Sequence, residues 1–171
     1  MSASRYDEKR DFEKTPEPSA SHVSGDVDPL TAPAGKTFVI QQHYATALHH
    51  DVRLELFNGD IPVLVSWAVP KGLPRRRGER HLAIRTEDHP IEYADFSGTI
   101  PEGEYGGGVV RMFDRGTYEV TGRTDDRLTF TLHGQRLSGT WHMVKVDFDD
   151  GKENWLAIMS EDHRPAGDPP P

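Results

Sequence analysis

The sequence has 171 residues and contains no cysteine. Disulfide bonds and thiolate chemistry are therefore excluded, and any metal ion must be held by histidine, aspartate or glutamate side chains. The sequence also lacks an apolar run of the kind found in signal peptides, and no segment is long enough to span a bilayer. We expect a soluble, intracellular, cytoplasmic protein with no membrane partner.

Long amphipathic helices are missing as well, since no stretch keeps a helical period over about twelve residues. Short apolar segments recur instead, separated by glycine, proline, asparagine and aspartate. These segments are 48–56, 61–69, 81–85, 109–113, 116–120, 127–132, 139–146 and 154–159. Short strands at regular spacing predict a mainly β, antiparallel barrel or sandwich. The Asn58-Gly59 pair predicts a tight hairpin between the first two segments.

The composition fits one folded domain with unpacked ends, since 35% of the residues are hydrophobic and 28% are charged. Residues 1–35 are rich in proline, glycine, serine and aspartate, and we expect a flexible arm there that carries part of the active site. Residues 36–160 form the expected β domain. Residues 161–171 form the expected disordered tail or linker.

The net charge of −8 is unevenly distributed. Residues 1–28 carry four lysines and arginines against seven acidic residues, residues 147–171 carry two against seven, and the rest carry 14 against 14. Within this neutral middle, the segment from Lys71 to Arg85 holds six cations and one glutamate. That segment is either a solvated loop or a contact for a phosphate backbone.

The stretch from Leu48 to Leu56, LHHDVRLEL, alternates apolar and polar residues, which is the period of a half-buried strand. As a strand it places His49, Asp51 and Arg53 on one face. As a helix it would turn Asp51 away from the other two residues and would form no single apolar stripe. We therefore predict a strand with one chemical face.

This face has the composition of a metal site. His49 and Asp51 share it, and His43 can join them across a bend, which gives a nitrogen and oxygen set suited to manganese, iron, zinc or cobalt. Arg53 adds a planar fork that matches phosphate or carboxylate. The alternative is a solvated strand face that carries two histidines. His50 interrupts the apolar face and is not expected to be a ligand.

Several motifs together resemble one known family, the 3′-phosphoesterase domain of bacterial ligase D and its free-standing relatives. The similarity extends from about Lys9 to Met159. The motifs are KRDF-x-x-TPEP, QH-x5-HHDVRLEL, SWAVPKG and EDHPIEYADFSGTIPEGEYGGG.

This resemblance implies a β-barrel whose concave face binds a divalent metal, usually manganese, with cobalt or zinc as alternatives. It implies two activities in DNA repair by non-homologous end joining. A phosphodiesterase removes a terminal 3′-ribonucleoside, and a phosphomonoesterase then leaves a 3′-OH. The expected substrates are primer-template 3′ ends that carry a 3′-ribonucleotide or a 3′-phosphate. The expected protein partners are an end-joining ligase, a polymerase or Ku.

The resemblance also assigns roles to individual residues. The implied metal ligands are His43, His49 and Asp51, and the implied phosphate contacts are Arg53, Lys71 and His89. Tyr93 matches the active-site tyrosine of the family, and Arg10, Asp11 and Glu17 match N-terminal residues needed for the diesterase step. At one position the chain departs from the family, because His81 replaces an arginine. A phosphate contact at this position is therefore either weaker or supplied by Arg80 or Arg85, and His81 is a second-tier candidate.

Within this scheme His89 is expected to protonate the leaving alkoxide. Its alternative role is that of a turn histidine beside Asp88, and the alternative for Tyr93 is core packing.

Two other functions fit parts of the pattern. His49-x-Asp51 with His133 or His142 would make the two-histidine, one-carboxylate triad of an Fe(II) oxygenase, testable by consumption of 2-oxoglutarate. The EDHP and SWAVPKG motifs favour the phosphoesterase, because an oxygenase does not require them. A non-catalytic DNA-end-binding module with a structural metal is the other alternative.

Overall fold

The computed structural model describes residues 5–19 and 26–160, and the predicted tail at 161–171 lies outside them. Within this part, strands dominate and the helices are short. The elements are α1 (Arg5–Glu8), β1 (Ala34–Tyr44), β2 (Leu48–Asn58), β3 (Ile61–Val69), β4 (Arg80–Arg85), β5 (His89–Pro90), the 3-10 helix η1 (Ile91–Asp95), β6 (Gly98–Ile100), β7 (Gly108–Arg123), β8 (Arg127–Gly134), β9 (Ser138–Val146) and β10 (Asn154–Met159). None of the helices in these residues could cross a membrane.

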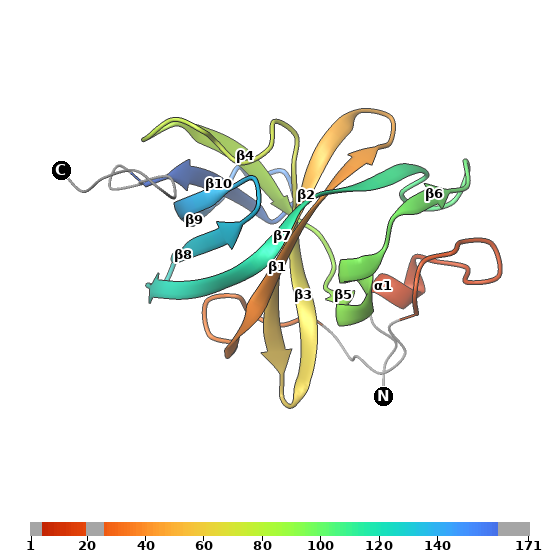
Figure 1. Ribbon diagram of the computed structural model, residues 1–171, viewed down its shortest axis with the longest axis horizontal. Coiled ribbons are helices and arrows are strands. Elements are labelled where there is room, and N and C mark those ends of the chain that lie inside the picture. Colours follow the sequence, from red (N-terminus) through yellow and green to blue (C-terminus); the bar gives the residue numbers. More distant parts are fainter. Residues whose placement is uncertain (1–4, 20–25, 161–171) are drawn as a thin grey trace.

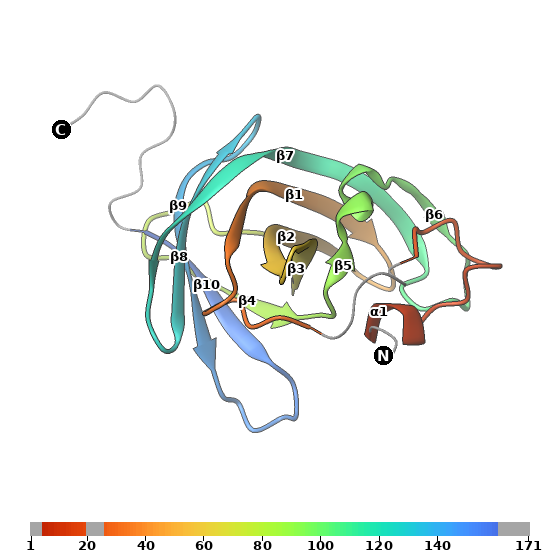
Figure 2. The same ribbon diagram turned by 90° about the horizontal axis from the view of Figure 1, so that it is seen from below.

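The sheet closes on itself as an antiparallel barrel (Figures 1 and 2). Eight strands follow one another in the order β1-β2-β3-β4-β10-β9-β8-β7, and β7 pairs back with β1. Two short strands are added to the barrel, β5 beside β3 and β6 beside β7. The prediction of a mainly β, antiparallel barrel is confirmed. In a closed barrel, the backbone hydrogen-bonding groups of the edge strands find partners, whereas a sandwich leaves some of them unpaired.

One predicted strand boundary is wrong, because segments 109–113 and 116–120 form the single strand β7. Gly116 does not mark a turn between them. A side chain at Gly116 would collide with the carbonyl oxygen of His133 on β8, so glycine is needed there for close approach of the two strands. The hairpin at Asn58-Gly59 is confirmed, and Gly59 takes the positive φ of 62° that such a turn requires.

Alternation along β2 separates the core from the chemical face, as predicted. Val52 and Leu54 are fully buried, and Val52 lies opposite Trp67 of β3. Trp67 packs edge-to-face on Trp155, with ring centroids 5.6 Å apart, so that aromatic rings fill much of this core. The intervening residues of β2 point the other way and leave the core apolar.

The face of β2 that points away from this core is covered by the N-terminal segment and by the segment that follows β4. After β4 the chain turns back, so that His89 of β5 pairs with Leu64 of β3. Tyr6 of α1 is fully buried and packs edge-to-face on His89, at 4.8 Å between centroids, and on Tyr93 of η1, at 6.0 Å. Figure 2 shows α1 and β5 beside each other, below the barrel strands β1 and β2.

Candidate active site

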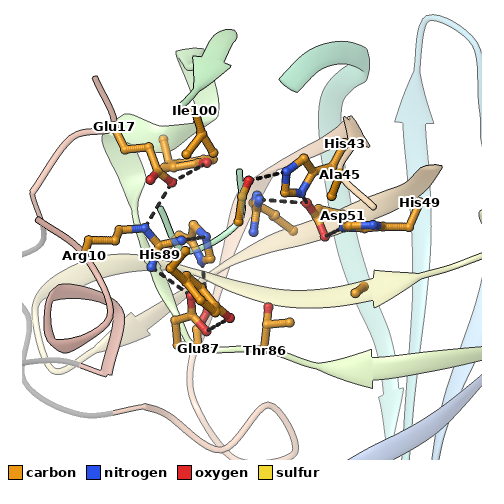
Figure 3. A pocket seen from close by; sticks show the side chains of 15 residues that line it. Arg10, Glu17, His43, Ala45, His49, Asp51, Thr86, Glu87, His89 and Ile100 are labelled. Atoms are coloured by element: carbon orange, nitrogen blue, oxygen red, sulfur yellow. Dashed lines mark hydrogen bonds and ion pairs between the residues drawn. The ribbon is translucent and has the colours of Figure 1, made fainter. Parts of the chain in front are cut away.

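A pocket of about 260 Å³ lies between the chemical face of the β1–β2 hairpin and these covering segments (Figure 3). Eight of the residues singled out in the sequence line it: Arg10, Glu17, His43, His49, Asp51, Arg53, His89 and Tyr93. They come from four separate parts of the chain. The fold therefore gathers most of the predicted site in one cavity.

Two of the predicted residues do not line this pocket. Lys71 is exposed in the turn that follows β3. Asp11 is also largely exposed, where its carboxylate accepts a hydrogen bond from the backbone N–H of Glu13 at 3.1 Å and lies 3.9 Å from the Lys14 ammonium. Their roles in phosphate contact and in the diesterase step remain predictions.

The two second-tier candidates, His81 and Arg85, also lie outside the pocket wall. His81 is held between the carbonyl of Gly72, at 2.6 Å from Nδ1, and the carboxylate of Glu79, at 2.7 Å from Nε2. Arg85 donates to Asp88 Oδ1 at 2.8 Å. Both side chains therefore have protein partners in this structure.

His43, His49 and Asp51 form a compact group in the pocket, and their potential ligand atoms all lie within 4.8 Å of one another. The hairpin places them there, because His43 of β1 pairs directly with His49 of β2. Asp51 Oδ2 lies 3.5 Å from His43 Nδ1, and Asp51 Oδ1 lies 3.1 Å from His49 Nε2. The sequence prediction that His43 swings back to the other two is confirmed.

The protonation of His43 shows that this group suits a cation. Its Nε2 lies 2.6 Å from the carbonyl oxygen of Gly106, which can only accept, so Nε2 carries the proton. Nδ1 then faces the Asp51 carboxylate at 3.5 Å, so that either a proton or a metal ion belongs between these two atoms. Two acceptors that face each other in a buried site favour a cation between them, and a backbone partner on the far ring nitrogen is typical of histidine ligands.

The pKa values of the neighbours agree with this interpretation. Burial alone would raise the pKa of Asp51, but Arg53, His43 and His49 lower it well below the usual value, so the group is a carboxylate at neutral pH. The hydrogen bond to Asp51 raises the pKa of His49. A bound divalent cation would take the place of the His49 proton.

Arg53 is the buried cation of the site, with only 2% of its surface exposed. Its Nε donates to Gln41 Oε1 at 2.7 Å, and its Nη2 donates to Asp51 Oδ2 at 3.4 Å. Its Nη1 is buried without a hydrogen-bond partner in the described residues. An unsatisfied guanidinium nitrogen in a pocket wall is costly unless a ligand accepts from it. The site therefore holds a donor that suits an anion beside a group that suits a metal.

Gln41 fixes this arrangement and was not identified from the sequence. It is fully buried on β1, and its amide nitrogen donates to the backbone carbonyls of Tyr93 and Phe96, both at 2.9 Å. Its carbonyl must therefore face Arg53. The alternation of side chains along a strand could have identified Gln41, because it places Gln41 on the same face as His43.

His89 is neutral in this pocket. Its Nδ1 lies 2.9 Å from the backbone carbonyl of Glu87 and so carries the proton, while Nε2 faces the Arg10 guanidinium at 3.5 Å and is an acceptor. Burial and the charge of Arg53 hold the pKa of His89 well below the usual value. The imidazole therefore offers a proton acceptor to the pocket, not a donor.

Arg10 joins the N-terminal segment to the barrel. Its Nε donates to Glu17 at 3.0 Å, and its Nη1 donates to Glu87 at 2.9 Å. Glu17 also accepts from the Tyr93 hydroxyl at 2.7 Å. Figure 3 shows Arg10, Glu17 and Glu87 on one side of the pocket and Asp51 with its histidines on the other. Glu87 is a further site residue that the sequence analysis missed, although it belongs to the EDHP motif.

The structure rules out the oxygenase triad in this form. His133 of β8 pairs with Glu119 at 2.9 Å, and Nδ1 of His142 on β9 lies 2.8 Å from the Thr129 hydroxyl. Neither histidine lines the pocket that holds His49.

The carboxylate of Glu87 should make the protein acid-labile. Burial would raise its pKa, but His89 and Arg10 outweigh burial and lower it to about 2. Because the folded pKa is depressed, the stabilisation is present above pH of about 4.5 and is lost as pH falls toward about 2. Between pH 5 and pH 2, the unfolding free energy of the parent should fall by on the order of 3 kcal/mol more than that of a Glu87→Gln variant. Urea unfolding across this range measures the difference, and parallel curves would contradict the assignment.

The chain is similar in sequence to known proteins of one family. The family model for the DNA Ligase D 3′-phosphoesterase domain matches residues 41–145. The chain is 48% identical over 159 residues to the multifunctional non-homologous end joining DNA repair protein LigD of Mycobacterium tuberculosis H37Rv, covering 90% of this chain and 19% of that protein. It is 39% identical over 162 residues to LigD of Pseudomonas aeruginosa, covering 92% and 18%. The chain spans about a fifth of the length of these relatives.

Proposed function

Because the chain belongs to the DNA ligase D 3′-phosphoesterase family, we propose that it is a metal-dependent phosphoesterase that heals DNA 3′ ends for non-homologous end joining. The observation that carries the proposal is the unpartnered Nη1 of Arg53 beside the group formed by His43, His49 and Asp51. Such a pairing of a metal and a forked cation suits a phosphate.

We propose that the substrates are primer-template 3′ ends that carry a 3′-ribonucleotide or a 3′-phosphate, and that both are converted in turn to a 3′-OH. The two histidines and Asp51 would hold manganese, or alternatively cobalt or zinc. When bound, the ion would neutralise phosphate charge and act as a Lewis acid. The donor set alone does not select among these metals, because all three accept imidazole and carboxylate ligands.

Arg53 would hold the scissile phosphate. Its Nη1 would donate to a non-bridging oxygen, while Gln41 and Asp51 keep the guanidinium from turning away. The Tyr93 ring lies 4.8 Å from the guanidinium carbon and fixes its plane. A preorganised, buried donor stabilises charge that develops in the transition state more than a mobile surface donor does.

His89 would act as the base. Its Nε2 would accept the proton of the attacking water as the new oxygen–phosphorus bond forms, while the ester bond breaks and the leaving alkoxide takes up a proton from solvent water. The sequence suggested proton donation instead, and the base role is favoured here because Nε2 faces the Arg10 guanidinium, which can only donate. The hydrogen bond from Nδ1–H to the backbone carbonyl of Glu87 holds the ring in this tautomer.

The proposal is tested by phosphate release from a DNA duplex that ends in a 3′-phosphate. The assay compares manganese, cobalt, zinc and a chelator, and a 5′-phosphate duplex of the same sequence serves as the control. We expect metal-dependent release from the 3′ end alone. Tight DNA binding without release under any metal would favour the non-catalytic end-binding module.

The N-terminal segment gives a prediction about the diesterase step. Arg10→Ala or Glu17→Ala should lower ribonucleoside removal at least about tenfold, because each breaks the network that holds Tyr93 and His89, while part of the 3′-phosphatase activity is kept. Deleting residues 1–18 is a poorer test, because it also removes the buried Tyr6.

Lys14→Ala, on the exposed part of the same segment, is the matched control. Both activities are measured on the same primer-template, with and without a terminal ribonucleotide. Equal losses of the two activities in Arg10→Ala and Glu17→Ala would show that the segment serves the whole site and not the diesterase step.

We further propose that the 3′-OH product passes to a polymerase or ligase of end joining, with Ku at the same DNA end. The support is the name of the relatives, which are described as multifunctional end-joining proteins.

A further inference from the structure

A surface on the opposite side of the β1–β2 hairpin from the pocket combines exposed cations with aromatic rings. We call it the cation–aromatic surface and define it by Tyr44, Arg75, Arg111, Phe113 and Arg136. The Arg111 guanidinium lies 5.8 Å from the Tyr44 ring centroid. The guanidinium groups of Arg75 and Arg136 lie 5.6 and 4.9 Å from the Phe113 ring. Nothing in the proposed reaction uses these side chains.

Strand register places this surface close to the pocket but on the other face. Tyr44 follows His43 directly on β1, so the two side chains point to opposite faces. Leu48 lies opposite Tyr44, and Arg111 of β7 lies opposite Gln42 on that same face. Figure 2 shows β7 running alongside β1. Only the thickness of one hairpin therefore separates the surface from the metal-binding group.

His50 lies at the Phe113 end of the surface. This histidine points away from the pocket, and its ring packs on Phe113 with centroids 4.5 Å apart. Its ring also lies against Gly72, in the turn that leads to Arg75. The sequence prediction that His50 is not a ligand agrees with this position, and Arg75 belongs to the basic segment noted in the sequence.

Asp114 fixes the position of Arg136. Its buried carboxylate accepts four backbone N–H groups, one from Arg115 and three from the turn at Gln135, Arg136 and Leu137, at 2.8 to 3.1 Å. The turn between β8 and β9 is thereby attached to β7 next to Phe113. The turn therefore holds Arg136 over the Phe113 ring.

The arginines of this surface have no carboxylate partner in the described residues 5–19 and 26–160. Arg75, Arg111 and Arg136 take part in no ion pair there, and neither do the neighbouring Arg76 and Arg77. Around the pocket, by contrast, the arginines are paired with carboxylates. The arginines of the cation–aromatic surface are therefore free to pair with an anion, although Glu102 and Glu104 line a hollow next to Tyr44.

We propose that the cation–aromatic surface binds the phosphate backbone of the DNA duplex behind the 3′ end, an inference that rests on the proposed function. Several unpaired arginines in fixed positions suit a row of phosphates. Single-stranded DNA would need exposed rings for base stacking, but Phe113 is only 9% exposed and lies under two guanidinium groups. The 41% exposed ring of Tyr44 would lie near the end of the duplex, where the 3′-terminal nucleotide passes around the hairpin tip at residues 45–47 into the pocket.

The test measures duplex binding against salt concentration by fluorescence anisotropy. The variant is Arg75→Gln/Arg136→Gln, and the control is Arg127→Gln/Lys152→Gln, which removes two exposed cations elsewhere. The slope of log Kd against the logarithm of the salt concentration should fall by about two in the variant. Each lost phosphate contact lowers this slope by about 0.9. At about 0.1 M salt, Kd should rise at least about tenfold. The control slope should stay within about 0.5 of the parent.

Three results would overturn the proposal: an unchanged slope in the variant, an equal change in the control, or an equal loss of affinity for single-stranded DNA. The rate on a dinucleotide 3′-phosphate, which is too short to reach the surface, should be unchanged in the variant. A parent protein that binds duplex with the predicted slope but releases no phosphate from any substrate would contradict the proposed function alone. Thermal melting checks that both double variants are folded.

Discussion

Replacing Asp51 with asparagine is expected to lower phosphate release by on the order of a thousandfold or more. The carboxylate lies between His43 and His49 and also accepts from Arg53, so its charge serves both the metal group and the phosphate clamp. Asparagine has nearly the same shape but no charge. The manganese affinity, measured by calorimetry, should fall together with the rate.

Asp88→Asn is the matched control, because Asp88 is also a buried carboxylate beside an arginine but lies outside the pocket. Burial raises the pKa of Asp88 to about 6, so loss of its charge should cost little. Asp88→Asn should keep manganese affinity and keep its rate within a few-fold. An Asp51→Asn protein that is folded and still binds manganese as tightly as the parent would contradict the metal assignment.

Replacing Arg53 with lysine should reduce the rate of 3′-phosphate release about a hundredfold, which corresponds to about 3 kcal/mol of transition-state stabilisation. Lysine keeps the charge but loses the fork, so it cannot bind Gln41 and Asp51 and also donate to a phosphate. Manganese affinity should change much less than the rate, because Arg53 is not a ligand. Rates are measured at saturating manganese.

Arg123→Lys provides the control for this substitution. Arg123 is another partly buried arginine of the barrel. Its Nε has no hydrogen-bond partner among residues 5–19 and 26–160, and its Nη2 donates to the carbonyl of Ala32 at 2.6 Å, but it lies outside the pocket. Its replacement should lower the melting temperature without a change in rate. Equal and small rate effects at Arg53 and Arg123 would mean that the anion site lies elsewhere.

The sequence predicted the chemical face because strand alternation is a local property. His49, Asp51 and Arg53 are two residues apart, and only the turn to His43 had to be inferred from a bend. The spacing of the apolar segments predicted an antiparallel barrel or sandwich, and the resemblance favoured the barrel, which closes between β1 and β7. The error at β7 arose because Asp114 and Arg115 interrupt the apolar pattern between segments 109–113 and 116–120, whereas the strand continues through them.

The parts that sequence alone did not supply depend on long-range contacts. Gln41 looks like an ordinary strand residue until its amide is seen to hold η1. Glu87 acquires its role only when Arg10, from the other end of the chain, lies beside it. The burial of Tyr6 could not be anticipated, because one aromatic residue in a polar segment has no periodicity.

The most direct measurement is a time course on a primer-template with a single 3′-ribonucleotide, with products resolved by length and by terminal group. We expect manganese-dependent formation of a 3′-phosphate end first, followed by its conversion to a 3′-OH, and neither product with a chelator. Absence of both products under manganese, cobalt and zinc, from a folded protein that binds the primer-template, would contradict the assignment of this pocket as a 3′-phosphoesterase site.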